Sequence, residues 1–315
     1  MIGVVDSGSG GLSVLKEMTR LLPGEKYLYY SDNAWCPYGE KTRDFIIERM
    51  RAVTDFLLGK GADIIVVACN TATSAAISTL REEYSDESSE QCRERVLRLT
   101  GGRRDHIRFI GMEPAVKPAA LGTRTGVIGV LATAGTLKGS KYLTSKGNVE
   151  DNVKVVEHVG SGFVELVESG RLEGPEVEKT VSESLQPLLR AGADIIVLGC
   201  THYPFLLPVM EKIAGPSVRF IDPAPAVARH LADVMKEDGL LSGKPSADIS
   251  LSGRPDVSLF SSGDDACLRS LFELAICREE GPSDRVRDLL DHRGGPSGLP
   301  SGSCPSCRIS RLARG

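Results

Sequence analysis

Two segments of the chain, residues 61–69 and 192–200, have almost the same sequence, GADIIVVAC and GADIIVLGC. Each begins with Gly-Ala-Asp, continues as a short apolar run and ends at a cysteine, Cys69 or Cys200. An apolar run of this length predicts a strand that is buried on both faces of a sheet. The polar residues after each cysteine are then expected at the carboxyl end of a strand, where open parallel sheets bind ligands.

A second pair of segments, residues 2–7 (IGVVDS) and 128–133 (IGVLAT), is also similar and precedes the first pair at a comparable offset. The chain is therefore predicted to contain two related halves, each of which supplies one cysteine from an equivalent position. The expected fold class is α/β, with two pseudo-symmetric three-layer α/β domains, mainly parallel sheets and an active site in the cleft between the domains.

The expected domain boundaries follow from the order of the predicted strands and helices. We predict that residues 1–112 and 218–280 form the first, discontinuous domain and that residues 113–217 form the second. A strand near residues 257–262 is expected at the edge of its sheet. Residues 281–315 are rich in Gly, Pro, Ser and Arg, and we expect a disordered tail because such a segment cannot bury a core.

Two thiols that face one cleft from opposite sides could act on the same carbon atom. One group would remove a proton from one face of that carbon, and the other would return a proton to the opposite face. The product is the mirror image of the substrate, and no cofactor is required. A single buried cysteine is usually just a small hydrophobe, so the prediction that Cys69 and Cys200 are an acid/base pair depends on their equivalent placement.

Other polar residues at the predicted strand ends could support this chemistry. The proton next to a carboxylate is weakly acidic, so fixed hydrogen-bond donors must stabilise the carbanion-like transition state. Candidate donors are Ser7, Asn70, Thr71, Thr133 and Thr201.

Two ionisable residues, Asp6 and His202, could set the protonation states of the thiols. A histidine considered alone is more often structural, but the position of His202 beside Cys200 in a cleft favours a functional role. A papain-like pair formed by Cys200 and His202 is a weaker interpretation. Adjacent residues in a turn need not face each other, and Cys69 would have no role.

The glycine-rich turn after the first predicted strand could suggest a dinucleotide site. However, Ser13 stands where the fingerprint requires its third glycine, and Asp6 places an acid near the expected phosphate. The turn is therefore predicted to present Asp6, Ser7 and backbone N–H groups to a polar ligand.

Composition excludes several other classes of protein. The 315 residues carry a formal net charge of -4, which argues against a dedicated nucleic-acid binder. The eight cysteines are irregularly spaced in a large chain, which is not typical of a disulfide framework. The pair Cys304 and Cys307 lacks a second cysteine pair at suitable spacing, so no metal site is expected.

Because the predicted first strand begins at residue 2 and no apolar run reaches membrane-spanning length, we expect a cytoplasmic protein with no membrane partner.

Taken together, these motifs resemble bacterial glutamate racemase, a family within the cofactor-independent aspartate/glutamate racemase superfamily. The resemblance covers roughly residues 2 to 275, and the combination of motifs is specific although each alone is weak. The matching segments are Asp6-Ser7-Gly8, Gly10-Gly11-Leu12, Asp32, Pro37-Tyr38-Gly39, Ala68-Cys69-Asn70-Thr71-Ala72, Glu113-Pro114-Ala115, Gly129 to Thr133, Leu198 to Pro204 and Ile221-Asp222-Pro223.

The resemblance implies a role for each matching site residue. Cys69 and Cys200 would be the acid/base residues, with Cys69 acting on D-glutamate and Cys200 on L-glutamate. The glutamate site would be lined by Asp6, Ser7, Tyr38, Gly39, Asn70, Thr71, Thr201 and His202. The resemblance also implies that the product D-glutamate is used in peptidoglycan synthesis and that the protein is a homodimer.

Three features depart from the pattern of this family. Asp-Thr-Ala-Arg usually precedes Pro-Tyr-Gly, but here the sequence is Asp32-Asn33-Ala34-Trp35, so a contact made by that arginine would be absent. The surface segment predicted at residues 84–106, part helix and part loop, is long. The segment after residue 280 has no counterpart in the family that can be placed. These departures leave the two cysteines untouched.

Three rival hypotheses remain at the level of sequence. The first is a related racemase for another substrate, such as aspartate or a hydantoin, and a substrate panel would distinguish it. The second is a binding or regulatory protein on a retired racemase scaffold, which would fold normally without exchanging a substrate proton. The third is a nucleotide-dependent oxidoreductase, which NAD would stabilise.

Overall fold

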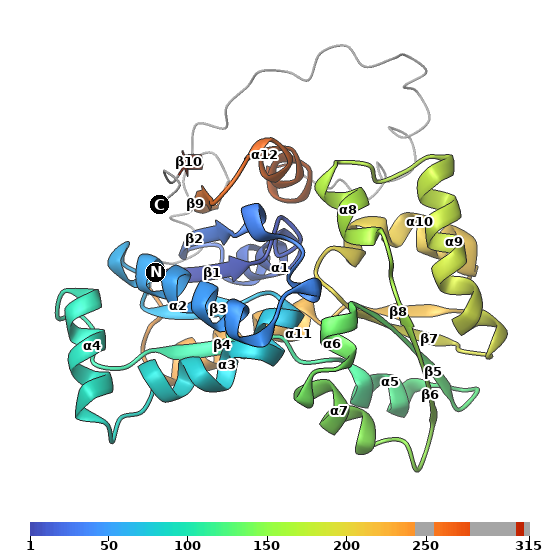
Figure 1. Ribbon diagram of the computed structural model, residues 1–315, viewed down its shortest axis with the longest axis horizontal. Coiled ribbons are helices and arrows are strands. Elements are labelled where there is room, and N and C mark those ends of the chain that lie inside the picture. The colour runs from blue at the N-terminus through green and yellow to red at the C-terminus, as the bar shows by residue number, and fades with distance from the viewer. Residues whose placement is uncertain (243–254, 278–306, 312–315) are drawn as a thin grey trace.

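A computed structural model shows two α/β lobes side by side, and it describes residues 1–242, 255–277 and 307–311 (Figure 1). Within these residues, the first lobe contains six parallel strands in the order β10-β9-β2-β1-β3-β4. They are β1 (Ile2–Asp6), β2 (Lys26–Ser31), β3 (Ile64–Val67), β4 (Arg108–Gly111), β9 (Asp256–Ser261) and β10 (Cys307–Arg311).

The second lobe contains a smaller parallel sheet in the order β6-β5-β7-β8. Its strands are β5 (Val127–Ala132), β6 (Lys154–Val159), β7 (Ile195–Gly199) and β8 (Arg219–Ile221). The order β2-β1-β3-β4 in the first sheet corresponds to β6-β5-β7-β8 in the second. The registers also correspond, since Ile2 pairs with Ile64 and Ile128 pairs with Ile195. The predicted repeat and the predicted fold class are confirmed.

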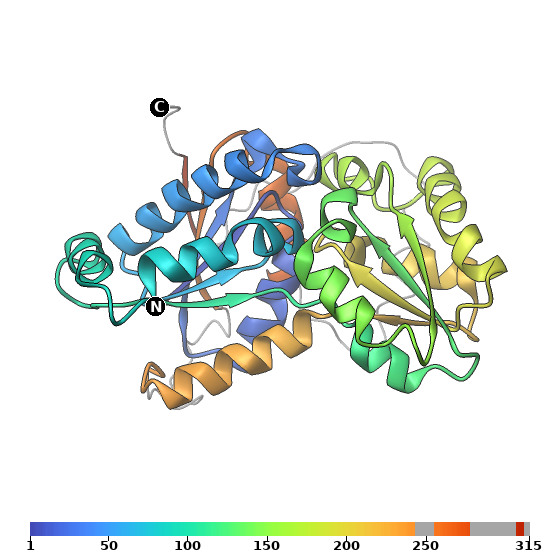
Figure 2. The ribbon, with the colours of Figure 1, turned by 60° about the horizontal axis from the view of Figure 1, so that its bottom comes forward.

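Helices cover both faces of each sheet, as the rotated view shows (Figure 2). The helices of the first lobe are α1 (Leu12–Leu21), α2 (Arg43–Gly59), α3 (Asn70–Tyr84), α4 (Glu90–Thr100), α11 (Ala224–Glu237) and α12 (Ala266–Phe272). Those of the second lobe are α5 (Val116–Gly122), α6 (Ala134–Leu137), α7 (Ser140–Gly147), α8 (Phe163–Glu168), α9 (Pro175–Arg190) and α10 (Leu207–Ala214).

The alternation of side chains along β1 explains the three layers. Val4 faces one core together with α1 and α11, whereas Val5 faces the other core together with α2 and α3. Successive residues of a strand point to opposite faces, so an uninterrupted apolar strand needs a helix layer on each side. The core that contains Val4 continues into the second lobe through Leu198 and joins the two halves.

Local signals explain several helix boundaries. The side chain of Thr42 accepts a hydrogen bond from the N–H of Phe45 at the start of α2. Ser89 caps α4 in the same way, and Gly101 ends that helix in the left-handed conformation. The surface segment at residues 84–106 therefore includes a well-defined helix.

Among the described residues, no helix is both long enough and apolar enough to cross a membrane.

Three details differ from the boundaries expected from sequence. The return crossing was expected at residue 218, but β8 pairs with β7, so the sheet of the second lobe extends to Ile221. The strand expected at a sheet edge, β9, lies between β2 and β10. Residues 307–311 were expected in a disordered tail, but they form β10, whose backbone pairs with β9. The rest of the predicted tail, residues 281–306 and 312–315, lies outside the described residues.

Candidate active site

The two cysteines of the repeat lie at the carboxyl ends of corresponding strands and face one narrow pocket between the lobes. Cys69 follows β3 and Cys200 follows β7, and both are buried. The pocket encloses about 280 Å³ of empty space, its open mouth included. Its lining residues are Ser7, Pro37, Tyr38, Gly39, Cys69, Asn70, Thr71, Thr133, Val164, Gly199, Cys200, Thr201 and His202.

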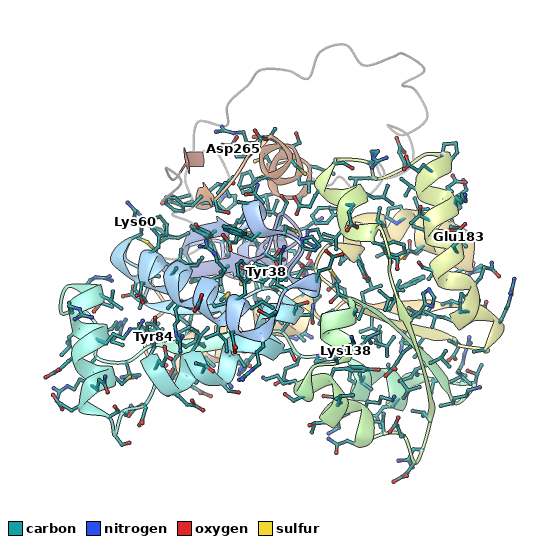
Figure 3. All side chains as sticks on the ribbon, viewed as in Figure 1. Tyr38, Lys60, Tyr84, Lys138, Glu183 and Asp265 are labelled. Atoms are coloured by element: carbon teal, nitrogen blue, oxygen red, sulfur yellow. The ribbon has the colours of Figure 1, made fainter. Side chains whose placement is uncertain are left out.

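This pocket brings together nearly all the site residues predicted from sequence. The exception is Asp6, which does not line the pocket but is buried beneath it. Figure 3 labels Tyr38 at the junction of the lobes, whereas Glu183 lies on the outer side of the second lobe.

Cys69 is the N-cap residue of α3, because its Sγ accepts a hydrogen bond of 3.4 Å from the N–H of Ala72. Its thiol donates to Oγ of Ser7 over 3.6 Å. Burial, followed by the nearby carboxyl of Asp6, raises the pKa of the Cys69 thiol to about 12. At neutral pH, Cys69 therefore holds its proton.

Cys200 is adjacent to an imidazole ring that a carboxylate orients. Its Sγ lies 3.7 Å from Nδ1 of His202, and Nε2 of His202 lies 2.7 Å from Oε1 of Glu168. Burial lowers the pKa of His202, but hydrogen bonds with Cys200, Cys36 and Glu168 outweigh burial and raise this pKa well above its ordinary value. The ring is therefore a proton reservoir next to Cys200.

The carboxylate of Glu168 is held from both lobes. Burial acts to raise the pKa of Glu168, yet hydrogen bonds from His202 and from the N–H and hydroxyl of Ser9 make the net shift downward. An ionised Glu168 beside a protonated His202 forms a charge-assisted pair that fixes the position of the ring.

Asp6 forms a second contact between the lobes. Its Oδ1 accepts a hydrogen bond of 3.2 Å from the hydroxyl of Thr201, and its Oδ2 accepts one of 2.9 Å from the N–H of Gly8. Burial raises the pKa of Asp6 to about 6, although His202 and the Gly8 N–H act in the opposite direction. Asp6 can therefore take up or release a proton near neutral pH.

Polar side chains from both lobes complete the pocket. Hydroxyl groups of three threonines form a cluster across the lobes: Thr71 lies 3.0 Å from Thr133, and Thr133 lies 2.9 Å from Thr136. Both polar atoms of the buried Asn70 amide lack a hydrogen-bond partner within the described part of the chain. Since a buried amide is normally satisfied, Asn70 is available to a polar ligand.

Sequence reasoning missed Glu168, Cys36 and Thr136. Glu168 is the last residue of the short helix α8, and it contacts Ser9 across 159 positions of sequence. No local motif marks such a contact. Thr136 could have been found from its position in the threonine-rich turn that follows β5, three residues after Thr133.

Comparisons with known proteins agree with this geometry. Residues 104–231 match the family model described as Asp/Glu/Hydantoin racemase. The glutamate racemase of Pseudomonas syringae pv. tomato is 44% identical over 247 residues, which cover 78% of this chain and 82% of that relative. The glutamate racemase of Pseudomonas entomophila is 42% identical over 288 residues, covering 91% of this chain and 97% of that relative.

Solved structures give the same result. A crystal structure of a glutamate racemase isoform from Bacillus anthracis superimposes with a TM-score of 0.71 at 29% identity, covering 87% of this chain and 92% of that one. A Francisella tularensis glutamate racemase in complex with D-glutamate superimposes with a TM-score of 0.67 at 26% identity. The match covers 89% of this chain and 94% of that one. On this similarity of sequence, together with the shared two-lobed fold, the chain belongs to the glutamate racemase family.

Proposed function

We propose that this chain interconverts L-glutamate and D-glutamate by proton transfer at the α-carbon, with Cys69 and Cys200 as the two acid/base groups. The observation that carries this proposal is that both thiols reach one pocket from corresponding strand ends of the two lobes. A substrate held between them presents one face of its α-carbon to each thiol. Membership of the glutamate racemase family supports glutamate as the substrate.

In the proposed reaction of L-glutamate, Cys200 acts as the base and Cys69 as the acid. The Cys200 thiolate takes the α-proton, so the Cα–H bond breaks and an S–H bond forms. The Cys69 thiol, whose raised pKa keeps it protonated at neutral pH, donates its proton to the opposite face of the carbon. The reverse reaction exchanges these roles, and the proton must return to its starting thiol before the next turnover.

His202 and Glu168 are the groups best placed to reset Cys200. The His202 ring can exchange a proton with Cys200 over the 3.7 Å that separate Nδ1 from Sγ. Glu168 holds the other side of the ring at 2.7 Å and stabilises its positive charge. In this proposal Glu168 is a positioning residue, because it acts through His202.

The substrate carboxylates are expected to bind hydrogen-bond donors at the lobe boundary. The side chain of Asn70 and the first N–H groups of α3 lie at the pocket, and a helix N-terminus attracts an anion. Negative charge develops on the α-carboxylate as the proton leaves. Donors already fixed in position can therefore stabilise the transition state more than the ground state.

The decisive experiment follows α-proton exchange and optical inversion of L- and D-glutamate in D₂O by NMR and polarimetry. The wild type should exchange and racemise both enantiomers without added cofactor. Cys69→Ala and Cys200→Ala should each abolish racemisation, whereas Cys92→Ala, which removes a buried thiol far from the pocket, should retain it. Racemisation that survives in either active-site variant would contradict the two-thiol mechanism.

Three broader properties belong to the same proposal. The D-glutamate formed would supply peptidoglycan synthesis, as in the family that the chain resembles. We also expect a cytoplasmic enzyme and a homodimer. Sedimentation velocity of the purified chain tests the homodimer, because a monomer at micromolar concentration would contradict it.

A further inference from the structure

Cys36 is a thiol at the active site for which the proposed reaction has no use. It lies between Trp35 and Pro37 in the segment where the sequence departs from the usual family pattern. Its Sγ, a carboxylate oxygen of Glu168 and a ring nitrogen of His202 all lie within 4.8 Å of one another. The three residues come from three separate parts of the fold, namely the segment after β2, the end of α8 and the turn after β7.

These three atoms form a ligand set of a recognisable kind. Thiolate, imidazole and carboxylate are the groups that bind Zn²⁺, and a site with three protein ligands leaves a fourth position open. Bond lengths of about 2.0 Å to nitrogen or oxygen and about 2.3 Å to sulfur imply ligand atoms roughly 3.3–3.5 Å apart in a tetrahedral site with one sulfur ligand. The observed cluster is within small side-chain movements of that spacing.

The backbone around Gly8 leaves the space that such a site needs. A Cβ atom at residue 8 would lie 3.0 Å from Sγ of Cys36 and 3.1 Å from Cδ of Glu168. The N–H and hydroxyl of Ser9 hold Glu168 in place. His202 is already oriented by the 2.7 Å contact with Glu168, where a metal would replace the shared proton.

We propose that Cys36, Glu168 and His202 form a binding site for one thiophilic divalent cation of the Zn²⁺ class. Binding would release the proton of the Cys36 thiol, and the proton between His202 and Glu168, to solvent. The thiolate and imidazole ligands favour Zn²⁺ or Co²⁺ over Mg²⁺ or Ca²⁺, which prefer oxygen.

Occupancy of this site would stop turnover. With the metal on Nε2, the His202 ring keeps a proton on Nδ1 and has no free nitrogen to accept a proton from Cys200. Glu168 can then no longer stabilise a doubly protonated ring. This consequence rests on the proposed function, whereas binding of the metal depends only on the three ligands. The site would therefore make the enzyme sensitive to inhibition by zinc.

The test is titration of the metal-free 315-residue chain with Co²⁺. The near-ultraviolet thiolate-to-cobalt charge-transfer band reports binding, and Zn²⁺ is then added to displace the Co²⁺. The wild type should bind one Co²⁺ and show the band. Cys36→Ala should lose the band and weaken Zn²⁺ affinity at least tenfold in calorimetry, while circular dichroism verifies its fold. Cys92→Ala, which removes a thiol of α4, should behave as the wild type.

A variant without the two pocket thiols separates this proposal from the racemase mechanism. The double variant Cys69→Ala/Cys200→Ala should be inactive yet keep the cobalt band, because neither thiol is a ligand in the proposed site. Zinc inhibition, normalised to the metal-free activity of each protein, should be weaker in Cys36→Ala. The proposal fails if the wild type gives no band, if the band persists in Cys36→Ala, or if it disappears in the double variant.

Discussion

The carboxyl group of Asp6, buried beneath the pocket, lowers the stability of the folded protein. Its pKa of about 6 in the folded protein exceeds the ordinary value of 3.8, chiefly because of burial. Between these two values the folded state binds more protons than the unfolded state, so stability falls as pH rises through this window. Above pH 6 the destabilisation is complete and amounts to about 2–3 kcal/mol.

Asp6→Asn should therefore stabilise the protein while impairing its activity. The amide can still accept from the Gly8 N–H and donate to the hydroxyl of Thr201. We expect a gain of about 1–2 kcal/mol in the free energy of unfolding at pH 8. The gain should shrink as pH falls from 6 to 4. Urea unfolding measured at several pH values checks this, with the exposed Asp151→Asn as control. A gain that does not depend on pH would contradict the argument.

Gly10 is required by the close approach of His202 and not by an unusual backbone angle. A Cβ atom at residue 10 would lie 2.6 Å from Cγ and 2.7 Å from Cε1 of that ring. Gly10→Ala should displace the ring from Cys200 and lower kcat/KM by about a hundredfold, since a misplacement near 1 Å has that effect. Steady-state racemisation measures the loss. Gly59→Ala should remain fully active, because no described residue beyond the neighbouring backbone of α2 has an atom within 4 Å of the added methyl.

At the scale of elements, the segment after β2 is anchored by a partly buried ion pair with α2. The side chain of Asp32 is fully buried and accepts hydrogen bonds of 2.8 and 2.9 Å from Arg49 and another from the hydroxyl of Tyr38. The guanidinium of Arg49 also lies 5.7 Å from the ring centroid of Trp35. The pocket residues Tyr38 and Gly39 depend on this anchor.

Arg49→Met should leave Asp32 buried without its cation. We expect a loss of about 2–4 kcal/mol in the free energy of unfolding and a higher KM for glutamate, because the pocket wall loosens. Urea denaturation and steady-state kinetics provide the two measurements. The matched control is Arg20→Met, which breaks an exposed pair with Glu17 and should change stability by less than about 0.5 kcal/mol. Equal losses in both variants would contradict the proposed anchoring role.

Elements with a strong local signal were predictable from sequence. The apolar runs at β3 and β7 predicted buried strands, and their shared pattern predicted the two sheets and the common pocket. The sheet to which β8 belongs was missed, because three residues carry too little pattern to assign a strand to a sheet. Glu168 was missed for a different reason, since its role depends on tertiary contacts with Ser9 and His202. The chemical roles of Cys69 and Cys200 stay predictions.

At the scale of the whole molecule, the pocket exists only because the two lobes meet. The hydroxyl of Thr201 reaches Asp6, and the threonine cluster joins Thr71 to Thr133. The hydroxyl of Ser13 also donates to the carbonyl oxygen of Thr201 over 3.0 Å. Because the pocket between them is narrow, we expect the lobes to separate for glutamate to enter and to close again on the ligand.

A ligand that bridges the lobes should raise the thermal stability of the whole chain. At a concentration about one hundred times Kd, binding adds about 2.7 kcal/mol, which corresponds to a rise in Tm of roughly 5 °C for a protein of this size. Differential scanning calorimetry should use the Cys69→Ala/Cys200→Ala variant, so that the enantiomers do not interconvert. Since the two thiols face the ligand from corresponding positions, L- and D-glutamate should both stabilise this variant. Norvaline, in which a methyl group replaces the side-chain carboxylate, should not. Stabilisation by one enantiomer only would contradict a pocket built to hold both.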